Sequence, residues 1–117
     1  MSDSAGVNAR PGDGELAGLR AELDGVDDRL LDTIRERIEI CTRIALVKRR
    51  HSIPVVQPHR MGAVHEHARS YAARHDLSPQ FLRAVYDLLI AETCRVEDRV
   101  IAEAAPGSVL VPESDRD

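Results

Sequence analysis

The sequence predicts an all-α fold of three helices, which are long, short and medium in that order. Apolar side chains recur at steps of three and four residues, as they do along the buried face of a helix. Proline marks two helix starts, at Pro58 and at Ser78-Pro79, and the only strand candidate is IPVV at residues 53–56. We therefore expect a helical domain over residues 15–105, between a disordered leader at residues 1–14 and a flexible tail at residues 106–117.

The first helix is expected to extend over roughly 35 residues and to be about 50 Å long, which exceeds the breadth of a compact domain of this size. It ends near His51, and its apolar stripe consists of Leu16, Leu19, Leu23, Val26, Leu30, Ile34, Ile38, Cys41 and Ala45. Two shorter helices of the same chain cannot cover such a stripe, so we expect an intertwined homodimer. The alternative is a single bent bundle, which needs a helix break, and Gly25 is a weak candidate for one.

The second helix is expected from about Pro58 to Arg74. Proline is favoured at the first helical position, where its missing N–H has no partner in any case. The third helix has a stronger start, with Ser78 as the N-cap and Pro79 directly after it. It ends before Pro106, and its apolar face consists of Phe81, Leu82, Val85, Leu88, Leu89, Val96, Val100 and Ile101.

The composition argues against several classes of protein. The net charge of −4 and the pI of about 5.7 argue against nucleic acid as the main partner of this protein. No apolar run reaches the length of a membrane span, and the N-terminus has no hydrophobic signal segment, so we expect a cytoplasmic protein. Cys41 and Cys94 fit no metal spacing and are expected to be reduced and buried. We expect no metal site and no cofactor.

Charged residues interrupt the apolar faces and predict an anion-binding cavity. Of the sixteen basic residues, only Lys48 is a lysine. It follows Arg37 by 11 residues, about three helical turns, so both cations project from one face. A planar arginine fork and a compact ammonium together suit a small anion with two different polar ends. Thr93 and Glu97 share a face of the third helix, and Arg60 opens the second.

Each of these residues also has an ordinary interpretation. Arg20 and Arg60 could form surface ion pairs, and Glu97 could form a structural salt bridge with Arg37 or Lys48. Arg20 precedes Arg37 by 17 residues and is rotated from it by roughly 100°, so it cannot reach the same pocket within one chain. It could reach the pocket of a partner chain if the long helices run antiparallel. Together the residues predict a dry, cationic cavity that holds one carboxyl group.

The stretch from Leu19 to Ile101 resembles the all-helical chorismate mutases, which are intertwined three-helix homodimers. The resemblance rests on LRAELDGVDDRLLDTIRERIEICTRIALVKRR, PVVQPHR and DLLIAETCRVEDRV. It implies a Claisen rearrangement of a small dicarboxylate without a cofactor. By this resemblance, Lys48 and a protonated Glu97 are the catalytic residues and donate hydrogen bonds to the ether oxygen. The resemblance also implies substrate-binding roles for Arg20 of the other subunit, Arg37, Arg60 and Thr93.

Two positions depart from the family pattern. The family usually has an acidic residue directly after the arginine of the second helix and an aspartate before it, but here these positions are Met61 and Gln57. QPHRM and ETCRVED resemble a subgroup that converts 4-amino-4-deoxychorismate to 4-amino-4-deoxyprephenate in antibiotic biosynthesis. The resemblance implies this function, with Gln57 and Met61 in substrate binding. Chorismate mutase is the alternative, and an isochorismate pyruvate lyase or a non-catalytic helical dimerisation module is less favoured.

Overall fold

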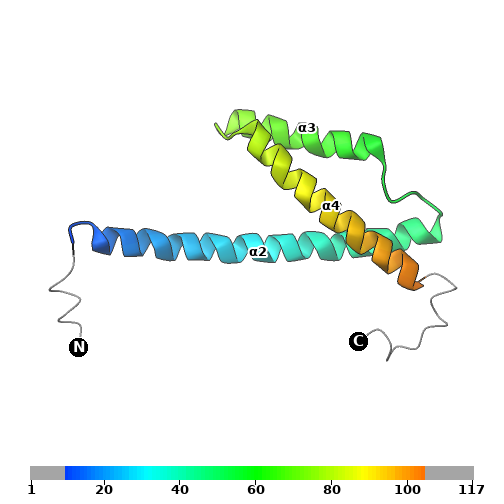
Figure 1. The fold of residues 1–117 in the computed structure, drawn as a ribbon, viewed down its shortest axis with the longest axis horizontal. Helices are drawn as coiled ribbons and strands as arrows, with labels where there is room; N and C mark the ends of the chain where they lie inside the picture. The colour runs from blue at the N-terminus through cyan, green and yellow to red at the C-terminus, as the bar shows by residue number, and fades with distance from the viewer. Residues whose placement is uncertain (1–9, 105–117) are drawn as a thin grey trace, which may run out of the picture. The chain divides into compact units, whose positions relative to one another are not determined.

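The computed structural model describes residues 10–104, which form α2 (Asp13–Arg50), α3 (Pro58–Arg74) and α4 (Pro79–Ala104) (Figure 1). The described residues contain no strand, and residues 53–56 lie in the irregular connection between α2 and α3. The predicted all-α fold class is therefore confirmed. The predicted tail and most of the predicted leader lie outside the described residues, and α2 begins at Asp13, within the segment expected to be leader.

The N-terminal part of α2 exposes the apolar stripe that the sequence predicts. The chain divides into two compact units at Glu36, and the described part of the first unit is residues 10–36. Gly25 lies within α2 and does not interrupt it. The side chains of the stripe are between 44% and 61% exposed: Leu16, Leu19, Leu23, Val26 and Leu30. A contiguous apolar surface of this kind is typical of an interaction site.

The C-terminus of α2 is closed by a Schellman motif centred on Ser52. This residue has a φ of 55°, in the left-handed region. The N–H of Ile53 donates to the carbonyl of Lys48 (2.8 Å), and the N–H of Ser52 donates to the carbonyl of Arg49 (3.4 Å). These are the two hydrogen bonds that define the motif. They attach the start of the connection to the last turn of α2.

A related turn, with one of these two hydrogen bonds, joins α3 to α4. Asp76 also has a φ of 55°, and the N–H of Leu77 donates to the carbonyl of Ala72 (3.0 Å). Ser78 then caps α4 as predicted, because its hydroxyl accepts a hydrogen bond from the N–H of Phe81 (3.1 Å). The turn is tight, and α4 folds back against α3 (Figure 1).

The buried apolar core is small and is made of short side chains from all three helices: Ala45, Ala68, Ala72 and Val96. Side chains of this size allow close approach between helices, and α3 and α4 pack closely against each other. Two polar residues of α4, Thr93 and Glu97, are as deeply buried as the core. Buried polar groups need partners, and both of these residues line a cavity. No helix of the described residues is long and apolar enough to cross a membrane.

Candidate active site

A cavity of about 310 Å³ is enclosed by the C-terminal part of α2, the connection after it, α3 and α4. It brings together seven of the eight predicted site residues: Arg37, Lys48, Gln57, Arg60, Met61, Thr93 and Glu97. The remaining lining residues are Cys41, Ile44, Val55, Val56, Val64, Ile90 and Cys94. The volume is at the lower end of the range for small-molecule sites. All of the lining residues belong to the unit that begins at Arg37.

Arg20 is the predicted site residue that does not line this cavity. It belongs to the unit of residues 10–36, where it is exposed to solvent. The sequence placed it out of reach of its own chain's pocket, since it lies 17 residues before Arg37. Its contribution to the site of a second chain stays a prediction.

Lys48 is fixed by two acceptors from different parts of the chain. Its Nζ donates to Oε1 of Glu97 (3.1 Å) and to the carbonyl oxygen of Val55 (2.7 Å). The side chains are well shielded, with 13% of Lys48 and 8% of Glu97 exposed. An ammonium has three N–H donors, so one remains without an acceptor among the described residues. Glu97 therefore forms the salt bridge with Lys48 that the sequence left as one of two possibilities. Its carboxyl group has a cation beside it in addition to its apolar neighbours.

Arg37 presents a donor that has no partner. Its Nη1 is buried and has no hydrogen-bond acceptor among the described residues. The guanidinium lies over the ring of Tyr86, with 5.7 Å between its carbon and the ring centre. A buried N–H without an acceptor is costly, and most such groups in folded proteins are satisfied. This donor is therefore suited to a ligand with an oxygen anion.

Thr93 is satisfied within its own helix, because its hydroxyl donates to the carbonyl of Leu89 (3.0 Å) or of Ile90 (3.2 Å). Its oxygen can still accept a hydrogen bond from a ligand. The residue is 5% exposed and forms part of the wall of the cavity. The predicted hydroxyl is thus in place, but its hydrogen is committed to the backbone.

Cys41 and Cys94 also line the cavity. The sequence predicted that they are reduced and buried; they are free cysteines, but both are of intermediate exposure and not fully buried. Burial is the largest cause that raises the pKa of the Cys41 thiol; the Arg37 charge opposes it and the Glu97 charge adds to it. Burial likewise raises the pKa of Cys94. Neutral thiols are poor nucleophiles, so the raised pKa values give no support to a nucleophilic role for these cysteines. The position of Cys41, four residues after Arg37 on the same helical face, is the signal that could have placed it here.

The connection and the start of α3 supply the other end of the cavity. Gln57 is the N-cap residue of α3, but its side chain makes no capping hydrogen bond. Its amide group therefore remains available at the cavity wall, where Met61 follows one turn later. Arg60 lines the same region and is more exposed to solvent. The cavity thus holds three basic side chains and one carboxylate, a balance that favours an anionic ligand.

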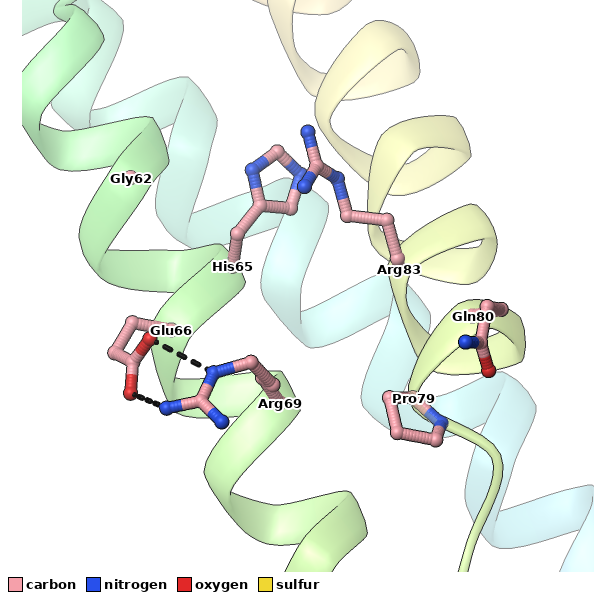
Figure 2. Close-up of a pocket in the computed structure, with 7 residues that line it drawn as sticks. All are labelled: Gly62, His65, Glu66, Arg69, Pro79, Gln80 and Arg83. Atoms are coloured by element: carbon pink, nitrogen blue, oxygen red, sulfur yellow. Dashed lines mark hydrogen bonds and ion pairs between the residues drawn. The ribbon is translucent and has the colours of Figure 1, made fainter.

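A second cavity, of about 490 Å³, lies between α3 and α4 and contains none of the predicted site residues. It is lined by Gly62, His65, Glu66, Arg69, Pro79, Gln80 and Arg83 (Figure 2). Its charged groups are already paired, Arg69 with Glu66 (3.0 Å) and His65 with Asp87 (2.8 Å). The smaller cavity, with its unpartnered donor, is therefore the candidate active site. The described residues contain no cluster of histidine, cysteine or acidic side chains that could hold a metal ion.

A cavity with three basic side chains and one carboxylate among three helices is typical of a small helical protein with a site for a small anionic molecule. The sequence model of chorismate mutase type II matches residues 19–98, and the chain belongs to this family. Two Streptomyces proteins called 4-amino-4-deoxychorismate mutase are similar to it. The one from Streptomyces pristinaespiralis is 53% identical over 97 residues, 83% of this chain and 73% of the relative.

The second, from Streptomyces venezuelae, is 51% identical over 88 residues, 75% of this chain and 85% of the relative. A more distant relative, called chorismate mutase, comes from Methanocaldococcus jannaschii and is 22% identical over 89 residues, 76% of this chain and 90% of the relative. The family and these relatives identify the chain as an isomerase of the mutase type, as the resemblance predicted.

Proposed function

We propose that this protein converts 4-amino-4-deoxychorismate to 4-amino-4-deoxyprephenate. The observation that carries the proposal is the cavity, which is lined both by Arg37, whose buried Nη1 has no acceptor among the described residues, and by the fixed ammonium of Lys48. The choice of substrate rests on the two Streptomyces relatives at 53% and 51% identity, which carry the name of this activity. A role in antibiotic biosynthesis and a place in the cytoplasm stay predictions.

The reaction is an isomerisation, in which a C–O ether bond breaks while a C–C bond forms. No atom enters or leaves, so the protein needs neither a nucleophile nor a cofactor for it. Its task is to hold the substrate in the reactive conformation and to stabilise the negative charge that develops on the ether oxygen. A neutral-thiol, cation-lined cavity supports that kind of chemistry.

The cations divide these tasks between them. Arg37 offers its free Nη1–H to a substrate carboxylate, and Arg60, at the more exposed side, offers a second cation. Lys48 directs its remaining N–H at the ether oxygen, where charge develops. Glu97 holds the ammonium in place by accepting a hydrogen bond from it. Its further role as a protonated donor to the ether oxygen stays a prediction, as does the contact of Thr93 with the substrate.

Gln57 and Met61 are proposed to contact the substituent at C4 of the substrate ring. The Gln57 amide can accept a hydrogen bond from an amino group, and its capping position leaves it free to do so. The Met61 thioether is a weak acceptor and an adaptable packing group. Neither residue brings a negative charge to this end of the cavity.

We further propose a homodimer in which Arg20 of each chain completes the cavity of the other. Two observations support it. The apolar stripe on residues 16–30 is exposed in the single chain, and Arg20 is exposed on the same helical segment. A second copy that covers the stripe would bring an additional arginine to a cavity that binds a dianion.

A side-by-side assay tests the proposed substrate. Purified protein is incubated with 4-amino-4-deoxychorismate and with chorismate, and loss of each substrate is followed while the product mass is determined. The expected result is a clear preference for the amino compound with a product of unchanged mass. Equal or faster turnover of chorismate would assign the protein to chorismate instead, a candidate that the family name itself favours.

A further inference from the structure

Tyr86 lies on α4 and is not one of the residues that line the candidate active site. The guanidinium carbon of Arg37 is 5.7 Å from the centre of the Tyr86 ring. At such a distance the face of an aromatic ring attracts a cation. Arg37 lines the cavity, whereas Tyr86 does not. Any effect of the tyrosine on a ligand must therefore pass through the arginine.

An aromatic ring and a carboxylate hold an arginine side chain in different ways. A carboxylate accepts hydrogen bonds from the guanidinium and so occupies its N–H groups. The face of a ring attracts the positive charge and leaves the N–H groups unoccupied. Nη1 of Arg37 is indeed buried without an acceptor among the described residues. The contact with Tyr86 thus fixes the cation while its donor stays ready for an anion.

The spacing of residues on two helices explains why the two cavity cations of α2, Arg37 and Lys48, each have a partner on α4. Lys48 follows Arg37 by 11 residues, and Glu97 follows Tyr86 by 11 residues. Eleven residues make about three helical turns, so all four side chains project toward the seam between the two helices. At one end Lys48 meets a carboxylate at 3.1 Å, and at the other Arg37 meets a ring at 5.7 Å.

The two ends of the seam therefore differ in charge. The carboxylate compensates the charge of Lys48, while the neutral ring leaves the charge of Arg37 uncompensated. A carboxylate in place of Tyr86 would compete with an anionic ligand for Arg37. The chemistry of the partner, a ring or an acid, decides which of the two cations is available to bind an anion.

We propose that Tyr86 is a positioning residue, which orients the Arg37 guanidinium so that its free N–H groups meet a carboxylate of the substrate. The inference rests on the proposed function, because it assigns that carboxylate to the substrate of the mutase reaction. The ring face, and not the hydroxyl group, carries the effect.

Tyr86→Phe and Tyr86→Leu test this, with Tyr71→Leu as a matched control. Tyr71 has Arg74 over its ring at the same distance of 5.7 Å, but Arg74, unlike Arg37, does not line the cavity. We expect Tyr86→Phe to keep the wild-type KM. Tyr86→Leu should raise KM about tenfold with little change in kcat, the effect of one lost cation–π contact. Tyr71→Leu should change neither constant. Thermal unfolding is measured for each variant, and Tyr86→Met replaces Tyr86→Leu if the latter does not fold.

A nuclear magnetic resonance measurement tests the contact between Tyr86 and Arg37 without requiring enzymatic turnover of a substrate. The ring current of Tyr86 should shift the Arg37 side-chain N–H signal upfield in the wild type and in Tyr86→Phe, and Tyr86→Leu should remove the shift. Arg37→Lys identifies the signal. Malonate, a simple dicarboxylate, should move this signal at lower concentration in the wild type than in Tyr86→Leu.

Three results would overturn the proposal: equal damage from Phe and Leu at position 86, an unchanged KM in Tyr86→Leu, or the same loss in Tyr71→Leu. Failure of the proposed function has a separate signature. In that case the wild type converts neither substrate, while the nuclear magnetic resonance comparison still reports whether Tyr86 orients Arg37 toward a dicarboxylate.

Discussion

Lys48 shows how a single side chain is prepared for its task. Its ammonium bonds Glu97 of α4 and the Val55 carbonyl of the connection. These two contacts restrain the ammonium at the wall of the cavity and leave one of its three N–H groups available to a ligand. A donor that is already oriented stabilises charge in a transition state without reorganisation, which is the largest single contribution in many enzymes.

Replacing Lys48 by alanine is expected to lower kcat by about a hundred- to a thousandfold, the usual effect of removing one donor to a developing charge. KM should change much less, because Arg37 and Arg60 still bind the carboxylates. Steady-state kinetics of Lys48→Ala measures both constants. Arg43→Ala is the control, since Arg43 is exposed on the same helix and does not line the cavity. A raised KM with an unchanged kcat would limit Lys48 to substrate binding.

Two elements of the fold depend on residues in the left-handed region of the backbone. Ser52 and Asp76 each have a φ of 55° and each follows the end of a helix, Ser52 in a Schellman motif and Asp76 in a turn with one of its two hydrogen bonds. Glycine adopts this conformation without the steric cost that a β-carbon brings. The chain tolerates a serine and an aspartate there because the surrounding hydrogen bonds fix the turns.

Ser52→Gly is expected to stabilise the protein by about 0.5–1 kcal/mol, because it removes the steric cost of the left-handed conformation. Ala63→Gly is the matched control, at an exposed position in the middle of α3. It should destabilise the protein by about 1 kcal/mol, the ordinary cost of glycine within a helix. Urea unfolding followed by circular dichroism gives both values. Destabilisation by Ser52→Gly would show that the serine side chain itself supports the turn.

At the scale of the whole molecule, the single chain has a cationic cavity in one unit and an exposed apolar stripe in the other. The stripe on residues 16–30 contains large aliphatic side chains, whereas the described core contains mainly alanine. A protein with so little buried apolar surface per chain gains stability by association. The proposed dimer would therefore have two effects: it would bury the apolar stripe, and it would bring Arg20 of one chain to the cavity of the other.

Mixing two inactive variants tests whether Arg20 acts across the dimer. Arg20→Ala and Arg37→Ala are purified separately, mixed in equal amounts and allowed to exchange subunits. Half of the dimers are then mixed, and each has one site with both arginines intact, so activity should recover to about a quarter of the wild type. If Arg20 acted within its own chain, every site would stay defective and mixing would restore nothing.

The sequence predicts the fold and the residues of the cavity for the same physical reason. Helical periodicity determines which side chains share a face, so spacing alone groups Arg37 with Lys48 on α2, and Thr93 with Glu97 on α4. The prolines at positions 58 and 79 mark where the two later helices begin.

Other features of the site have no such signal in the sequence. The hydrogen bond from Lys48 to the Val55 carbonyl uses a backbone atom that every residue type possesses. The contact between Arg37 and Tyr86 depends on how α2 and α4 cross, which periodicity within one helix does not determine. In the proposed dimer, the contribution of Arg20 to a site depends on a second chain. Each of these depends on an arrangement in three dimensions and not on residue type or spacing.

The short connection of residues 51–57 has a consequence for how this protein can change its length. Surface loops are normally the places where insertions and deletions are tolerated. Here the same seven residues close α2, supply the carbonyl that holds Lys48 and end at Gln57 in the cavity wall. One residue added or removed would displace the ammonium and the amide together. We therefore expect libraries with random insertions to retain active members elsewhere on the surface, while this loop keeps its length.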